Sequence, residues 1–173
     1  MIRVATVADA PAICQIYNHF VLHSTATFEE VAIDADEMTR RIDAILPRLP
    51  FLVAEIDGAL AGYAYAAPWK PRSAYRHTVE SSVYIAPGCA GMGLGTRLYQ
   101  ALLQALRERG VHAVLAGIVL PNEASVALHE AFGFCAVGRM REVGRKFDQW
   151  LDVGYWECLL AQPAQRLGND AGP

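Results

Sequence analysis

A strand, a glycine-rich turn and a helix start follow one another at residues 82–98, and ligand chemistry is expected there. Residues 83–85 are β-branched or aromatic, which favours a strand, and Pro87-Gly88 ends it. Glycines at 91, 93 and 95 have no Cβ, so their backbone can approach a ligand closely. Leucine recurs at every fourth position from 94 to 106, which predicts a helix. Free N–H groups and the helix dipole at its start favour a phosphate or pyrophosphate.

Two common phosphate-binding motifs do not fit this glycine spacing. A dinucleotide fold has G-x-G-x-x-G on its first strand-to-helix turn, whereas Gly91-x-Gly93-x-Gly95 stands in mid-chain. A phosphate loop of nucleotide hydrolases has G-x-x-x-x-G-K-[ST], and no lysine follows these glycines. Both nucleotide folds are therefore excluded.

The stretch instead resembles the acetyl-coenzyme A motif of the GCN5-related N-acetyltransferases (GNAT), Q/R-x-x-G-x-G/A, placed after the fourth strand. Residues 122–134 resemble the second signature of that family, in which Asn opens a helix and Gly-Phe closes it. One departure is Ala90, which stands where the motif has Gln or Arg, so that cofactor affinity is lower or Arg97 compensates. Four segments further resemble the phosphinothricin and methionine sulfoximine acetyltransferase branch: residues 27–29, 79–84, 128–129 and 144–152.

The resemblance implies a binding site for acetyl-CoA and no metal. The fourth strand would lend its backbone to the pantetheine arm, one N–H would polarise the thioester carbonyl, and the glycine turn would hold the pyrophosphate. Asn122 would contact the pantetheine or the leaving side of the cofactor. The implied cofactor-binding residues are Val83, Tyr84, Ile85, Gly91, Met92, Gly93, Leu94, Gly95, Thr96 and Asn122.

Two residues are candidates for the catalytic proton transfers. Glu80 precedes the thioester-binding residues in the same strand and would remove the amine proton through a water; its alternative is a solvated or ion-paired strand residue. A carboxylate with a pKa of about 4.3 is a weak base, so burial or a water chain is required. His129 takes the place of a tyrosine that protonates the thiolate in many relatives; its alternative is a core histidine whose N–H is satisfied by backbone.

The acceptor site is expected to recognise an amino acid with a second polar or anionic group. Arg72 is the candidate clamp for a carboxylate or phosphinate, because its planar fork suits bidentate pairing, and Ser73 and Tyr75 lie beside it. Phe28 and Glu29 resemble the first substrate loop of the branch, and Glu29 could hold the ammonium group. Each of these residues has ordinary surface as its alternative. The loop from Trp69 to Tyr75 could equally be a dimer contact, since members of the branch are commonly dimers. Lys146 and Trp150 are further candidates.

The elements that position these residues alternate in a mixed α/β (α+β) pattern. Strands are predicted at residues 2–5, 51–56, 60–67, 78–85, 111–119, 134–145 and 150–160, with a tight Asp57-Gly58 turn. Helices are predicted from Pro11, after an Asp34 cap, at 94–109 and from 122 to 133. The resemblance implies the GNAT acyl-CoA N-acyltransferase fold, a mostly antiparallel sheet of about seven strands flanked by about four helices. We expect one N-acetyltransferase domain over residues 1–161 and a flexible tail over 162–173.

Composition narrows the class of protein. The net charge of −3 gives no electrostatic case for nucleic acid or an anionic membrane surface. The four cysteines have no CxxC or metal-ligand spacing, and His19 and His23 have no evident third ligand, so reduced thiols and no metal are expected. No signal pattern and no apolar run of about 20 residues is found, so the expected location is cytoplasmic.

The sequence thus predicts acetyl-CoA-dependent N-acetylation of a small amino-acid-like amine, by direct transfer in a ternary complex and in a homodimer. An acetylated Cys89 intermediate is disfavoured because no base stands beside it in the motif. The alternatives are acetylation of a protein N-terminus or a polyamine, and a non-catalytic module that binds acyl-CoA.

Overall fold

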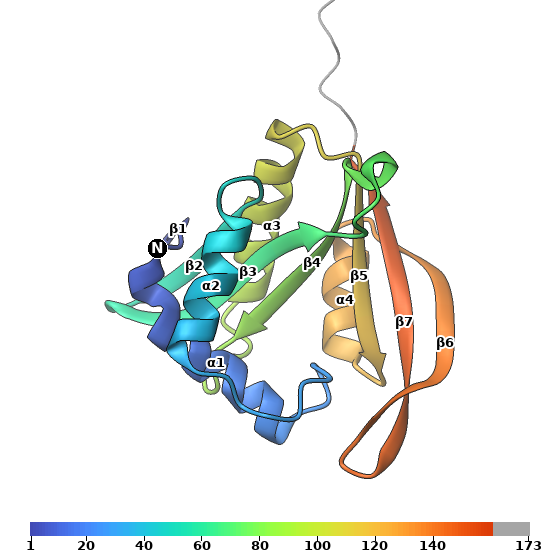
Figure 1. Cartoon of the computed structure of the whole chain (residues 1–173), viewed down its shortest axis with the longest axis horizontal. Helices are drawn as coiled ribbons and strands as arrows, with labels where there is room; N and C mark the ends of the chain where they lie inside the picture. The colour runs from blue at the N-terminus through green and yellow to red at the C-terminus, as the bar shows by residue number, and fades with distance from the viewer. Residues whose placement is uncertain (161–173) are drawn as a thin grey trace, which may run out of the picture.

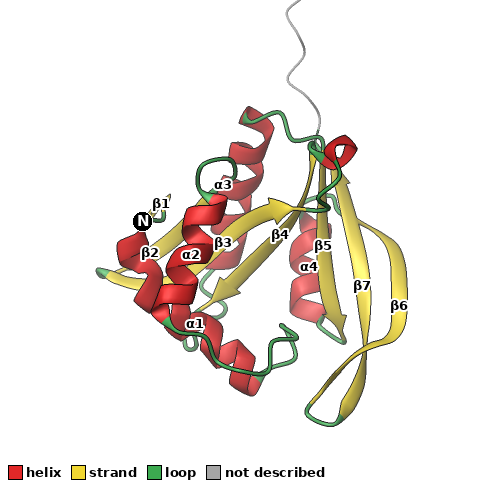
Figure 2. Ribbon diagram, viewed as in Figure 1, coloured by secondary structure: helices red, strands yellow, loops and turns green. Residues whose placement is uncertain are grey.

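The computed structural model describes residues 1–160 of the 173 residues, so the predicted tail at 162–173 lies outside the described residues. The chain forms a sheet with helices on both faces (Figures 1 and 2). Its strands are β1 (Ile2–Val4), β2 (Phe51–Ile56), β3 (Ala59–Pro68), β4 (Thr78–Ile85), β5 (Ala113–Leu120), β6 (Cys135–Lys146) and β7 (Gln149–Leu159). Its helices are α1 (Ala10–His23), α2 (Ala35–Ile45), α3 (Leu94–Glu108) and α4 (Glu123–Ala131), with short 3-10 turns at Val7–Asp9 and Ser73–Tyr75.

The sheet has seven strands in the order β1-β2-β3-β4-β5-β7-β6, and only the β4–β5 pair is parallel. The predicted α/β class and the mostly antiparallel sheet are therefore confirmed. Helices α1 and α2 bury their apolar side chains with Phe51, Val53 and Tyr63 on one face. Helix α3 buries Leu98, Leu102 and their neighbours on the other face. The sheet is thus sandwiched between two apolar cores.

Local sequence signals account for most element ends. Asp34 caps α2 by accepting a hydrogen bond from the Glu37 backbone N–H at 2.7 Å. Asn122 caps α4 in the same way, accepting from the Ser125 N–H at 3.1 Å. Asp57 and Gly58 both have positive φ, as a tight hairpin between β2 and β3 requires. These predictions are confirmed, and the predicted strand ends lie within two residues of the observed ones.

Strands β4 and β5 are paired at their N-terminal ends and then separate. They pair only where Thr78–Glu80 lies opposite Ala113–Leu115. Beyond that point the two strands diverge, as Figure 1 shows, and α4 lies behind the opening. Among residues 1–160, this edge of β4 therefore has no strand partner beyond Glu80.

The backbone alternation of β4 decides which groups face this opening. The Ala86 N–H donates to Ala61 of β3 at 2.8 Å, and Thr78 accepts from the Trp69 N–H at 3.3 Å. Even-numbered residues of β4 therefore direct their backbone groups to β3, because the direction alternates along an antiparallel ladder. The N–H and C=O groups of Val83 and Ile85 consequently face the opening.

Within residues 1–160, no helix is long and apolar enough to cross a membrane. In the same range no cluster of three His, Cys, Asp or Glu side chains could hold a metal ion. The cysteines Cys14, Cys89, Cys135 and Cys158 are all free thiols.

Candidate active site

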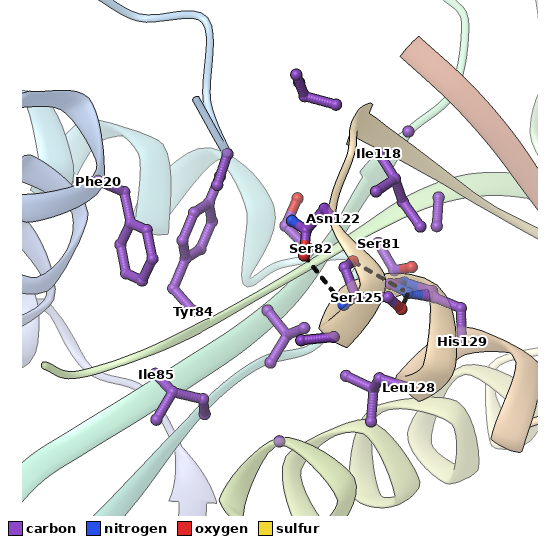
Figure 3. A pocket seen from close by; sticks show the side chains of 17 residues that line it. Phe20, Ser81, Ser82, Tyr84, Ile85, Ile118, Asn122, Ser125, Leu128 and His129 are labelled. Carbon is purple, nitrogen blue, oxygen red and sulfur yellow. Dashed lines mark hydrogen bonds between the residues drawn. The ribbon is translucent and has the colours of Figure 1, made fainter. Parts of the chain in front are cut away.

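A cavity of about 260 Å³ fills the opening between β4 and β5 (Figure 3). The exposed edge of β4 forms one wall, and Asn122, Ser125 and Leu128 of the α4 segment contribute another. Phe20 and Tyr84 stand together at one end, with their ring centroids 5.2 Å apart. The cavity can therefore take a slender chain that hydrogen-bonds to the free backbone groups of Val83 and Ile85. The backbone groups of Tyr84 face β3, so only its side chain reaches this space.

The glycine turn leads from β4 into α3 beside this cavity. Gly91 and Gly93 have φ of +79° and +71°, a backbone conformation that costs other residues about 1 kcal/mol or more. A Cβ at Gly95 would meet Leu128 at an ordinary 3.7 Å, so protein packing does not demand glycine at this cavity-lining position. Without a Cβ, the backbone of Gly95 is open to the cavity. Leu94 is buried in the core, so it offers only its backbone N–H.

The first-turn N–H groups of α3 have no partner inside the helix, and the dipole makes this end positive. Met92 and Thr96 are exposed at the same place. Ala90 and Arg97 are also exposed, so neither is held by the protein interior. The geometry fits a pyrophosphate held by backbone donors, followed by a chain that enters the cavity.

Glu80 stands where β4 and β5 begin to separate. Its carboxylate lines a second cavity of about 290 Å³, together with Thr27, Phe28 and Tyr155. A Cβ on Gly117 would lie 2.9 Å from Glu80 Oε1, so the glycine makes room for the carboxylate. Burial raises the pKa of Glu80, while the positive charge of Lys70 and the Gly117 N–H oppose that shift. A raised pKa makes this carboxylate a stronger base than an exposed one.

His129 is only 4% exposed, and it lines the first cavity from α4. Its Nδ1 lies 2.7 Å from the Ser125 carbonyl oxygen, which can only accept, so Nδ1 carries the proton. Its Nε2 is buried without a hydrogen-bond partner among the described residues. Burial lowers the pKa of His129 and favours the neutral ring. A neutral ring of this tautomer presents a lone pair at Nε2, so it accepts a proton there and does not donate one.

The residues expected to bind the acceptor are placed in different regions. Phe28 lines the second cavity beside Glu80. The carboxylate of Glu29 lies 2.8 Å from Arg41, so it already has a cationic partner. Arg72, Ser73 and Tyr75 are exposed in the β3–β4 connection, and none of them lines either cavity within one chain. Within the single chain, the Arg72 group thus lines neither cavity with Phe28 or Glu80.

Three residues that the sequence analysis did not assign stand near Glu80 instead. Tyr155 of β7 lines the second cavity, and its ring packs edge-on against Trp69 with centroids 5.5 Å apart. Lys70 lies 4.5 Å above the Trp69 ring and is the cation that acts on Glu80. The β5–β7 register places Tyr155 opposite Gly117, and no local sequence signal encodes that register.

Comparison with known proteins agrees with this geometry. The acetyltransferase (GNAT) domain family matches residues 2–154. The phosphinothricin N-acetyltransferase of Streptomyces viridochromogenes is 44% identical over 94% of this chain and 89% of its own length. The L-methionine sulfoximine/L-methionine sulfone acetyltransferase of Salmonella typhimurium is 40% identical over 94% of this chain and 96% of its own.

A solved structure supports the same conclusion. An acetyltransferase of Salmonella typhimurium, determined with its cofactor acetyl-CoA, superposes with a TM-score of 0.91 and 39% identity, covering 95% of each chain. The family match spans both the glycine turn and the α4 segment that line the first cavity. The chain therefore belongs to the GNAT acetyltransferase family, and it is an N-acetyltransferase.

Proposed function

We propose that the protein transfers the acetyl group of acetyl-CoA directly to the amino group of a small amino acid of the phosphinothricin or methionine sulfoximine/sulfone type. One observation carries the proposal: the half-buried Glu80 lies where β4 and β5 separate, in the wall of the second cavity and next to the first. An amine in the second cavity can thereby face a thioester in the first. The two substrates react in a ternary complex without a covalent enzyme intermediate.

Acetyl-CoA occupies the first cavity and the glycine turn in this proposal, and it supplies an acetyl group activated as a thioester. The backbone of Val83 and Ile85 binds the pantetheine arm, and one N–H there polarises the thioester carbonyl. The N–H groups from Gly91 to Thr96 hold the pyrophosphate. Asn122 borders the pantetheine from the start of α4.

Glu80 accepts the amine proton, through a water, as the nitrogen attacks the carbonyl carbon. The C–S bond then breaks, and the thiolate leaves with its electron pair and takes up a proton. We retain His129 as the proposed donor of that proton. It can act only when both ring nitrogens are protonated, because neutral His129 has no proton on Nε2. The buried position of the ring opposes this form, which makes the role testable by pH.

The acceptor lies in the second cavity, with its amine at Glu80 and its side chain among Phe28, Val143 and Tyr155. We retain Arg72, Ser73 and Tyr75 as proposed ligands of its anionic group when a second chain brings them to the site. Glu29 is a proposed ligand of the ammonium group only if it exchanges its Arg41 partner.

We further propose a homodimer in the cytoplasm. Strand β6 is an edge strand, and large apolar side chains are exposed along it and its hairpin. Such a surface favours association over exposure to water. The exposed side chains are Val137 at 55%, Met140 at 42%, Val143 at 49%, Phe147 at 51% and Trp150 at 62%.

Release of free thiol from acetyl-CoA, measured with a panel of amines, tests the function. The panel holds phosphinothricin, methionine sulfoximine, methionine sulfone, spermidine and a short peptide that begins with alanine. Release with the first three amines is expected. Release with only the peptide or only spermidine would contradict the amino-acid acceptor and would indicate a protein N-terminus or a polyamine instead. Thermal stabilisation by acetyl-CoA without release with any amine would support a non-catalytic binding module.

A further inference from the structure

The loop between α1 and α2, residues 24–34, borders the second cavity; we call it the acceptor loop. Both helices contact its middle: Tyr17 Oη of α1 lies 2.9 Å from Thr27 Oγ1, and Arg41 of α2 pairs with Glu29 at 2.8 Å. Asn18 of α1 secures its far end, donating to the Ile33 carbonyl at 2.8 Å and accepting from the Ile33 N–H at 3.0 Å. Ser24 Oγ accepts from the Ala26 N–H at 3.0 Å at the near end. Thr27 and Phe28, in the middle, form part of the second cavity.

The β6–β7 hairpin reaches across to this middle part. Lys146, the last residue of β6, is 1% exposed, and its Nζ donates to the Thr27 carbonyl at 2.8 Å. The same ammonium lies 3.4 Å from the Phe20 carbonyl in the last turn of α1, where the helix dipole favours a cation. Among residues 1–160, no carboxylate forms an ion pair with Lys146. The Lys146 ammonium therefore contacts main-chain oxygens, and its hydrogen bond to Thr27 links the hairpin to the acceptor loop.

A second contact, independent of charge, lies two residues earlier. A Cβ on Gly144 would stand 2.2 Å from Phe28 Cε2 and 2.4 Å from Cζ. Real Cβ atoms essentially never approach so closely, so any side chain here must displace the Phe28 ring. Gly144 is outside the positive-φ region, so alanine adds no backbone strain. The glycine therefore leaves room for the Phe28 ring against β6.

We propose that Gly144 and Lys146 are positioning residues: they hold the acceptor loop against the hairpin, fix Phe28 as a wall of the second cavity, and so set acceptor binding. Lys146 lines neither cavity, so it acts through Thr27 and Phe28 and touches neither substrate. This inference rests on the proposed function in taking the second cavity as the acceptor site. Burial lowers the pKa of Lys146 while Glu30 and Glu29 oppose the shift, which is consistent with a lysine enclosed by the loop.

Three variants separate this role from general stability. Lys146→Met keeps the length of the side chain and removes the donor. Gly144→Ala keeps the donor and displaces Phe28. Arg145→Met is the matched control, because it removes the same charge one residue away. Arg145 is 54% exposed, forms an ion pair with the exposed Asp148 and lies 6.0 Å from the centroid of the Trp150 ring.

Initial rates are measured against the acceptor and against acetyl-CoA, and amide hydrogen exchange is followed over residues 24–34. We expect kcat/KM for the acceptor to fall about tenfold or more in Lys146→Met and Gly144→Ala. The KM for acetyl-CoA should stay within about twofold, and Arg145→Met should match wild type. Exchange at residues 26–29 should become faster in Lys146→Met.

The proposal is overturned if both variants keep the acceptor kcat/KM and the exchange rates of wild type, or if the KM for acetyl-CoA rises as much as that for the acceptor. If Lys146→Met does not fold, Gly144→Ala decides between these outcomes. If wild type acetylates no amine, the proposed function fails, whereas the exchange measurement still tests whether Lys146 holds the loop.

Discussion

At the scale of single residues, position on the sheet sets the chemistry of each candidate group. Glu80 is half-buried at the point of strand divergence, with the Gly117 N–H and the Lys70 charge beside it. His129 is enclosed by the rings of Tyr99 and Phe134, with centroids 4.8 Å and 5.3 Å from its own. A carboxylate with a raised pKa and an imidazole with a lowered pKa are thus placed on two sides of one site.

Glu80→Gln should lower kcat by about 10²- to 10⁴-fold, because it removes the general base. Wild-type kcat should fall as the pH drops through the raised pKa of Glu80, where the carboxylate takes up its proton. The free energy of unfolding should depend on pH in the opposite way to kcat. Because the pKa of Glu80 is raised in the folded state, its ionisation costs stability as the pH rises. Glu80→Gln should therefore equal or exceed wild type in Tm at neutral pH. Steady-state kinetics and thermal unfolding measure both effects. An unchanged kcat would remove Glu80 from the mechanism.

His129→Gln should reduce the acid sensitivity of the fold. The folded-state pKa of His129 is lowered, so the unfolded chain binds more protons below its usual pKa of about 6.5. Wild type should therefore lose more free energy of unfolding between about pH 7.5 and about pH 5.5 than the variant does. Urea unfolding at the two pH values measures the difference, and equal losses would contradict the burial argument. Unchanged turnover in His129→Ala from about pH 6 to about pH 9 would exclude an acid role.

At the scale of elements, the start of α3 and the opening between β4 and β5 are proposed to bind different parts of acetyl-CoA. The helix start offers charge complementarity to phosphates, and the opened strand edge offers unpaired main-chain groups. Both features are made of main-chain groups, so the proposed cradle does not require a Gln or Arg side chain at position 90.

Ala90→Arg should tighten acetyl-CoA binding about fivefold if a phosphate contact is missing there. The exposed position of residue 90 means that the new side chain has no core to disturb. Calorimetric titration with acetyl-CoA measures the change, with Arg97→Gln as the companion variant. An unchanged Kd in Ala90→Arg together with a raised Kd in Arg97→Gln would show that Arg97 already makes the contact.

At the scale of the whole molecule, the two faces of the sheet pack different helices and border different parts of the proposed site. The α3 face packs the larger core behind the glycine turn, and the α1–α2 face carries the acceptor loop beside Glu80. Strand β6 forms one edge of the sheet (Figure 2). Large apolar side chains are exposed along it. A second chain on that edge would cover them.

Val137→Lys should weaken the proposed dimer, because it puts a charge on a side chain that is 55% exposed on the edge strand. Sedimentation velocity over a range of concentrations measures the change. Val7→Lys is the control, since Val7 is similarly exposed, at 48%, next to α1. A wild-type chain that sediments as a monomer at all concentrations would contradict the homodimer and the supply of Arg72 from a second chain.

Much of the fold could be predicted because its signals are local. Caps at Asp34 and Asn122, the Asp57-Gly58 turn and the leucine spacing of α3 each depend on a few neighbouring residues. The glycine turn is also local, and its spacing with the α4 signature was sufficient to identify the family. These features do not depend on which strands meet.

The acceptor side of the site could not be predicted in the same way. It depends on pairings between residues far apart in the chain: Tyr155 opposite Gly117, Phe28 on Gly144, and Lys146 on Thr27. Strand register and loop packing decide these contacts through side chains that meet only in the folded state. The sequence by itself therefore determined the family, the order of elements and the glycine turn between β4 and α3. Only the tertiary structure decided that β4 opens away from β5, that Arg72 lines neither cavity in one chain, and that a buried lysine contacts the acceptor loop.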